Sequence, residues 1–92
     1  MRETVPTLHI PAVLFHLSND EKEIIVEGNN LRAIFRKVSE LYPDLVDRII
    51  QDDSLRPDIA VAIDGTILED GNLIQPLAPD AQIYLVPPIG GG

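Results

Sequence analysis

The chain has no cysteine. A protein without thiols cannot form disulfides, hold a thiolate metal site or an iron–sulfur cluster, or supply a cysteine nucleophile or persulfide. Aromatic residues are also scarce, at 4% of the chain, so Val, Ile and Leu must form most of the core. Thiol chemistry is therefore excluded from the functions that this chain can perform with its own side chains.

Basic residues are few: 7 Lys and Arg stand against 15 Asp and Glu, for a net charge of −8. Binding to nucleic acid or to an anionic lipid surface needs clustered Lys and Arg that neutralise phosphates. The composition argues against both of these partners. It favours a partner protein with an electropositive surface. Most individual carboxylates are explained more simply, because acidic charge keeps a small protein soluble.

Long apolar segments are also missing, and none approaches the length that spans a membrane. The first residues include Glu3 and Pro6, where a signal peptide would need an uninterrupted apolar stretch. We therefore expect a cytoplasmic protein with no membrane partner.

Sequence motifs typical of catalytic and metal-binding sites are absent as well. His9 and His16 are seven residues apart and fall on opposite strand parities, so they cannot share a metal ion unless the strand is broken between them. The acidic pairs Asp52–Asp53 and Glu69–Asp70 lie in predicted turns, where solvated acids are the normal occupants. No glycine-rich loop joins a strand to a helix as phosphate-binding loops do. We expect no catalytic residues, no metal and no bound cofactor, and hence no enzyme.

What the chain does contain is enough for one domain, since it has 92 residues of which 45% are hydrophobic. Leu31, Ile34 and Val38 begin an apolar stripe at helical spacing, with Asn29 or Asn30 as the N-cap and Pro43 as the stop. Alternating apolar residues and turn signals predict the rest. The expected order is strands over 7–15 and 23–27 as an antiparallel hairpin, the helix over 31–42, a short helix over 44–50, a loop over 52–58, and strands over 59–63, 66–68 and 82–86.

This order predicts an α+β fold of the ubiquitin-like β-grasp type, with a mixed sheet of four to five strands packed on one main helix. The residues expected to face the helix are Leu8, Ile10, Leu14, Ile59, Val61, Ile63, Ile83 and Leu85. The opposite face is expected to carry His9, Val13, Ala60, Ala62, Tyr84 and Val86. Such an apolar face is either a partner surface or covered by the N-terminal arm or a loop.

The most informative segment is the end of the chain, where the predicted strand leads through Pro87–Pro88 to Gly90, Gly91 and Gly92. Glycines cannot pack into a core, and the prolines should direct the chain outward in an extended form. We expect a domain over residues 1–89 and a flexible tail over 90–92. A tail without side chains can thread a narrow channel and bring its terminal carboxylate to another protein's active site. Alternatively, the glycines are only a disordered chain end.

The segment from Leu77 to Gly92 resembles the end of ubiquitin-like sulfur carriers of the MoaD/ThiS family, which share a turn, an apolar strand, prolines and then glycines. Residues Leu8–Leu14 resemble the first strand of the carriers that serve cysteine synthesis. The helix from Leu31 and the turn over residues 62–65 are also similar in kind and spacing. The resemblance thus covers nearly the whole chain and is most specific at the tail.

The resemblance implies that a ubiquitin-activating-type enzyme uses ATP to adenylate the carboxylate of Gly92. A sulfur donor would then convert the acyl-adenylate to a thiocarboxylate, which a sulfur-accepting synthase consumes. Gly90 and Gly91 would thread the partner's active site, and the expected docking contacts are Tyr84, Val86, Pro88 and Ile89.

The family usually ends in two glycines, so either Gly92 is the working end or a peptidase first trims the chain to Gly91. The prolines before the tail resemble molybdopterin carriers, whereas the length and first strand favour carriers for cysteine or homocysteine synthesis. Two other functions use the same sequence features. The chain could be a ubiquitin-like modifier joined to lysines through its tail, or a β-grasp interaction module with inert glycines.

Overall fold

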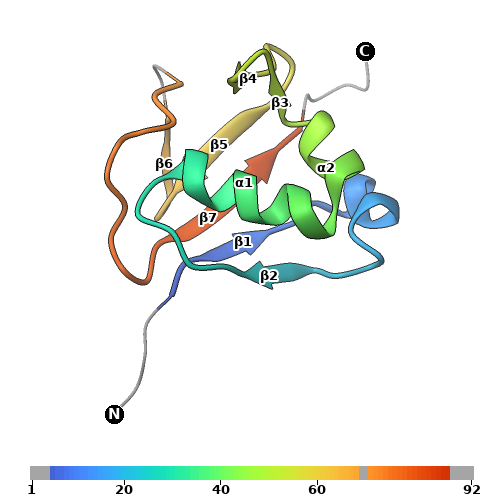
Figure 1. Cartoon of the computed structure of the whole chain (residues 1–92), viewed down its shortest axis with the longest axis horizontal. Helices are drawn as coiled ribbons and strands as arrows, with labels where there is room; N and C mark the ends of the chain where they lie inside the picture. Colours follow the sequence, from blue (N-terminus) through green and yellow to red (C-terminus); the bar gives the residue numbers. More distant parts are fainter. Residues whose placement is uncertain (1–4, 69–70, 88–92) are drawn as a thin grey trace.

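The computed structural model describes residues 5–68 and 71–87, and these form a five-stranded sheet with a helix across one face (Figure 1). The elements in chain order are β1 (Thr7–His9), the 3-10 helix η1 (Ala12–Leu17), β2 (Glu23–Ile25), α1 (Leu31–Leu41), α2 (Pro43–Asp47), β3 (Ile50–Gln51), β4 (Ser54–Leu55), β5 (Ala60–Ile63), β6 (Thr66–Ile67) and β7 (Gln82–Val86).

The sheet has the strand order β2-β1-β7-β5-β6. The first and last strands, β1 and β7, are parallel neighbours in its middle, and every other pair in it is antiparallel. Helix α1 lies diagonally across this sheet (Figure 1). A mixed sheet that holds one main helix confirms the predicted ubiquitin-like β-grasp.

The core forms between α1 and the inner face of the sheet, as the apolar pattern predicted. Asn30 caps α1, and its side chain accepts a hydrogen bond of 2.9 Å from the backbone N–H of Ala33. The helix buries Leu31, Ile34, Phe35 and Val38. Of the residues expected to face it, Ile59 and Ile63 are half-buried and the others are buried, namely Leu8, Ile10, Leu14, Val61, Ile83 and Leu85.

The predicted strand over residues 7–15 is wrong beyond His9. Proline cannot donate a ladder hydrogen bond, and at Pro11 the chain leaves the sheet for η1, where the N–H of Leu14 donates to the carbonyl of Pro11 at 2.9 Å. Leu14 still reaches the core. Val13, expected on the outer sheet face, instead lies on η1 with 62% of its surface exposed.

The segment after α1 also differs from the prediction. Pro43 begins α2, because the fixed φ of proline suits a first helical position. The helix ends at Asp47. The predicted loop over 52–58 contains half of a small hairpin, since β3 pairs antiparallel with β4. Its turn residues, Asp52 and Asp53, have φ of 55° and 63°, a left-handed conformation that Asp tolerates better than most residues. This acidic pair therefore has a conformational role, as its predicted place in a turn suggested.

Besides β1, three more strands are shorter than predicted. Strand β2 ends at Ile25 and β6 at Ile67, and β5 begins at Ala60. Within the described ranges, no helix is both long enough and apolar enough to cross a membrane.

Candidate functional site on the last strand and the outer sheet face

Strand β7 connects the middle of the sheet to the glycine tail. Its side chains alternate, so that Ile83 and Leu85 are buried while Tyr84 and Val86 lie on the opposite face. Tyr84 is 43% exposed and Val86 is half-buried. Pro87 is the last described residue. The remaining predicted site residues lie outside the described residues, namely Pro88, Ile89, Gly90, Gly91 and Gly92.

The strand register brings Tyr84 into a row of side chains that crosses the whole sheet. The paired residues in this row are Glu23, His9, Tyr84, Ala62 and Ile67. Neighbouring rows add Ile25 on β2, which is 65% exposed, and Val86 beside Ala60. We call these residues and Gln82 the outer sheet face. Among the described residues, helices α1 and α2 lie on the other side of the sheet (Figure 1).

The centre of the outer sheet face is an ordered polar and aromatic cluster. The rings of His9 and Tyr84 are stacked, with centroids 4.2 Å apart and planes 6° from parallel. Nε2 of His9 lies 2.7 Å from Oε1 of Gln82, which accepts a hydrogen bond when Nε2 carries the proton. Nδ1 of His9 lies 3.6 Å from a carboxylate oxygen of Glu23. These contacts hold the Tyr84 ring flat against the ring of His9.

This face is more polar at its centre and more apolar at its edges than the sequence indicated. Alternation along the predicted last strand placed Tyr84 and Val86 on the sheet face opposite the helix, as observed. It could not show that Tyr84 stacks on His9, because that contact depends on the parallel register of β1 and β7. Ile25 and Ile67 were missed, although the hairpin turn at Asp64–Gly65 is a signal that would have paired Ile67 with Ala62.

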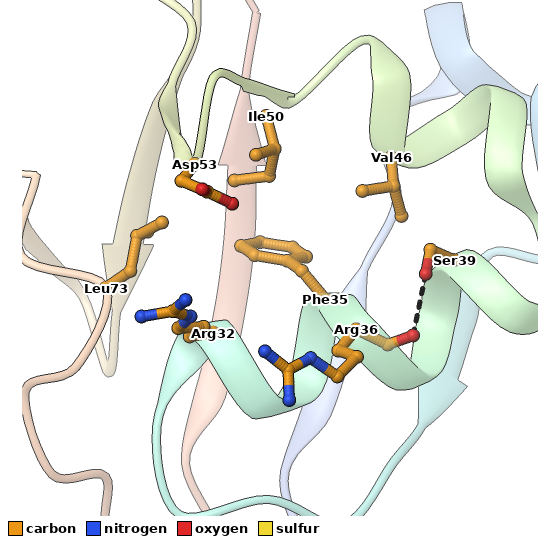
Figure 2. A pocket seen from close by; sticks show the side chains of 8 residues that line it. All are labelled: Arg32, Phe35, Arg36, Ser39, Val46, Ile50, Asp53 and Leu73. Carbon is orange, nitrogen blue, oxygen red and sulfur yellow. Dashed lines mark hydrogen bonds between the residues drawn. The ribbon is translucent and has the colours of Figure 1, made fainter.

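The helical side of the molecule has a separate pocket of about 220 Å³. Figure 2 shows the ring of Phe35 pointing from α1 towards Ile50. Arg32 and Arg36 lie on the same helix and also line the pocket. The hydroxyl of Ser39 donates to the backbone carbonyl of Arg36 at 2.7 Å, so it is already engaged. Asp53 is the one carboxylate among the lining residues. This lining contains no nucleophile paired with a base, the arrangement that nucleophilic catalysis needs.

The fold and the last strand together define the class of protein, a ubiquitin-like β-grasp domain whose final strand ends in a glycine tail. The chain belongs to the ThiS family, whose model matches residues 8–92. This is a family of small ubiquitin-like sulfur carriers and modifiers, which agrees with the resemblance noted in the sequence.

Solved structures give the same fold. The chain is similar to the one in the crystal structure of the Amycolatopsis orientalis BexX/CysO complex, with a TM-score of 0.85 and 20% identity over 95% of this chain and 99% of that chain. It is also similar to Mycobacterium tuberculosis CysO, with a TM-score of 0.79 and 18% identity over 91% and 99% of the two chains.

The solution structure of small archaeal modifier protein 1 from Methanosarcina acetivorans is comparably similar. It has a TM-score of 0.79 and 19% identity, with 100% of both chains covered. A comparison with curated proteins finds no significant match. At these identities the structures establish the fold and leave the chemistry to be inferred from the site.

Proposed function

We propose that this chain is a cytoplasmic sulfur carrier whose C-terminal glycine carboxylate, Gly92 in this sequence, is the reacting group. The observation that carries the proposal is the position of β7. It is locked between β1 and β5 and leads without a linker into Pro87 and the glycines. In this proposal the rigid strand sets the direction in which the glycine segment is presented to a partner. The match of the ThiS family model through residue 92 supports the same conclusion.

The proposed chemistry takes place on a partner enzyme. The α-carboxyl group is deprotonated at neutral pH, so its oxygen can attack the α-phosphorus of ATP and displace pyrophosphate. The product is an acyl-adenylate, a mixed anhydride with AMP as leaving group. A donor of sulfide-level sulfur, such as hydrosulfide, then attacks the carbonyl carbon, AMP departs with the bonding electron pair, and the carrier ends in a thiocarboxylate. In this scheme ATP is bound by the activating enzyme, and Gly90 and Gly91 occupy its channel.

Docking would use the outer sheet face. Tyr84 and Val86 are on the described part of this surface, and Pro88 and Ile89 remain predicted contacts that follow them. Exposed Ile25 and Ile67 add apolar area on either side. An aromatic residue that is partly exposed and already oriented is a typical anchor in protein interfaces. The complex of a similar carrier fold with a second protein supports this mode of action.

The downstream partner is a synthase that accepts sulfur from the thiocarboxylate, and we favour cysteine or homocysteine synthesis over molybdopterin synthesis. Two of the similar structures are of proteins called CysO, which is consistent with that branch. A peptidase that removes Gly92 and leaves Gly91 as the acceptor is compatible with the same scheme.

The direct test is ATP–pyrophosphate exchange with each ubiquitin-activating-type enzyme of the host. We expect exchange that depends on the full chain, because adenylation of the carboxylate releases pyrophosphate reversibly. A chain ending in a C-terminal amide is the matched control and should support none, since it lacks the nucleophilic oxygen. Exchange that is equal for the acid and the amide, or absent with every such enzyme, would contradict the proposal.

A protein modifier is the second candidate, and the similarity to a small archaeal modifier protein favours considering it. Conjugation to lysines would use the same adenylate but would give adducts of higher mass. Cell extract probed for this chain should show such adducts if it is a modifier, and only the free carrier if its role is sulfur transfer. In the third alternative, an interaction module, removal of Gly91 and Gly92 would leave the biological activity intact.

A further inference from the structure

A second pocket lies where β7 ends, at the root of the tail. Its volume is about 290 Å³. Segments from η1, from the residue that follows α2, and from the stretch before β5 meet Pro87 there. We call it the tail-root pocket, and its lining residues are Val13, Leu14, His16, Arg48, Arg56, Asp58, Ile59 and Pro87. Figure 1 shows η1 and α2 at the end of the sheet towards which β7 points.

The pocket combines an apolar floor with a basic rim. Leu14 and Ile59 contribute buried or half-buried apolar surface, and Val13 exposes an isopropyl group to solvent. Arg48 and Arg56 provide two of the chain's 7 basic residues. The charge of these two side chains is opposite in sign to the net charge of the whole chain, which is −8.

The two arginine side chains differ in the contacts that they make within the described part of the chain. Nε of Arg56 lies 3.3 Å from a carboxylate oxygen of Asp58, and Nη1 donates to the carbonyl of Asp47 at 3.5 Å. Asp58 is the acidic residue of the lining and is therefore already paired. Within the described part of the chain, Arg48 makes no ion pair and its side chain is exposed. Its guanidinium is available to an incoming carboxylate.

We propose that the tail-root pocket binds an acidic segment, tipped by an apolar side chain, of the enzyme that activates the tail. This inference rests on the proposed function and identifies a second contact for the same partner. The apolar side chain would enter over Leu14 and Ile59, and a flanking carboxylate would meet Arg48. The volume is at the lower limit of the roughly 300–1,000 Å³ typical of small-molecule sites, which suits a side chain better than a cofactor.

A tail extended in a channel would carry the reacting carboxylate away from these arginines. Five residues follow Pro87, and an extended chain spans about 3.3 Å per residue, so the Gly92 carboxylate can lie about 16 Å from the pocket when the tail enters a channel. That separation exceeds the reach of an arginine side chain. The pocket would therefore contact the surface around the channel entrance.

The contact would set the orientation of docking. An acidic protein is attracted to any basic surface, and that attraction alone does not define one pose. A basic rim beside the tail adds a requirement for an acid at one place on the partner, because a like charge there would be repelled. The tail would then point into the channel only in the correct pose.

The test uses the full chain with two charge reversals of equal size. Arg48→Glu places an acid on the rim. Arg36→Glu is the matched control, since Arg36 is also exposed but lines the pocket on the helical side. The measurement is the KM and kcat for each chain in ATP–pyrophosphate exchange with the host activating enzyme, together with circular dichroism to establish that both variants fold.

We expect Arg48→Glu to raise the KM about tenfold or more with kcat unchanged, and Arg36→Glu to change it by less than about twofold. Reversing the partner's acidic residue to Arg should restore the KM of Arg48→Glu. If wild type is active but the two variants have equal KM, the docking inference is wrong and the proposed function stands. If wild type supports no exchange, both are wrong.

Discussion

At the scale of single residues, Tyr84 is the side chain on which the docking model depends most. It lies in the middle row of the outer sheet face, stacked on His9, and shares that face with Val86. Alternation along the last strand predicted its exposure. The histidine contact could not be predicted from sequence, since no local pattern reveals which residue of β1 lies beside it.

We expect Tyr84→Ala to weaken binding to the activating enzyme, with KM raised about tenfold, or about 1.4 kcal/mol. The variant loses a partly exposed ring and a stacking contact of about 0.5–1.5 kcal/mol, so it should remain folded. Leu41→Ala is the control, because Leu41 is 65% exposed but lies at the end of α1 on the other side of the sheet. Equal KM for both variants would contradict docking through this face.

Glycine positions within the domain give a stability prediction at the same scale. At Gly28, between β2 and α1, an added Cβ would lie 2.7 Å from Cγ1 and 3.2 Å from the backbone nitrogen of Ile34. Ile34 is buried, so it cannot move aside freely. We expect Gly28→Ala to lower the free energy of unfolding by about 1–3 kcal/mol in urea titration.

Gly65 provides a contrast, because its added Cβ would meet nothing within 4 Å but its φ is +88°. Gly65→Ala should cost about 1–2 kcal/mol through backbone strain alone. Asn tolerates positive φ, so Gly65→Asn should recover part of the loss, whereas Gly28→Asn should be worse than Gly28→Ala. A recovery by Asn at Gly28 would show that crowding is not the cause there.

At the scale of elements, the sequence was most informative where periodicity was long. Helix α1 follows an apolar stripe with a capping Asn30 and a stopping proline, and its bounds agree with the prediction to within one residue. Strand β7 and the Asp64–Gly65 hairpin were also predicted correctly. In each case a local rule and the tertiary environment favour the same structure.

The sequence was less informative where an element is short. The alternation from Leu8 to Leu14 fits a strand, yet Pro11 removes a ladder donor and the chain turns into η1. The hairpin of β3 and β4 has only two residues in each strand, too few for a periodic signal. Both missed elements line pockets, since η1 lines the tail-root pocket and the hairpin lines the pocket on the helical side.

At the scale of the whole molecule, charge should control how fast the carrier meets its enzyme. With a net charge of −8, steering towards a basic partner surface weakens as salt screens it. We expect the association rate constant, measured by stopped flow, to fall about tenfold between about 0.05 M and about 0.5 M salt.

The variant pair Asp52→Asn and Asp53→Asn tests this effect without disturbing the turn, since Asn also tolerates the left-handed conformation found at both positions. The double variant should show a smaller salt dependence and an unchanged free energy of unfolding. An association rate that does not respond to salt would show that the acidic charge serves only solubility.

The central proposal is that the C-terminal carboxyl group is converted to a thiocarboxylate. The most direct test is the intact mass of the protein isolated from its own cells. The account predicts a fraction in which sulfur replaces one oxygen on the terminal residue, Gly92 or, after trimming, Gly91. That fraction should disappear when the activating enzyme is deleted. An unmodified terminus in every molecule, during growth that requires the sulfur-containing product, would contradict it.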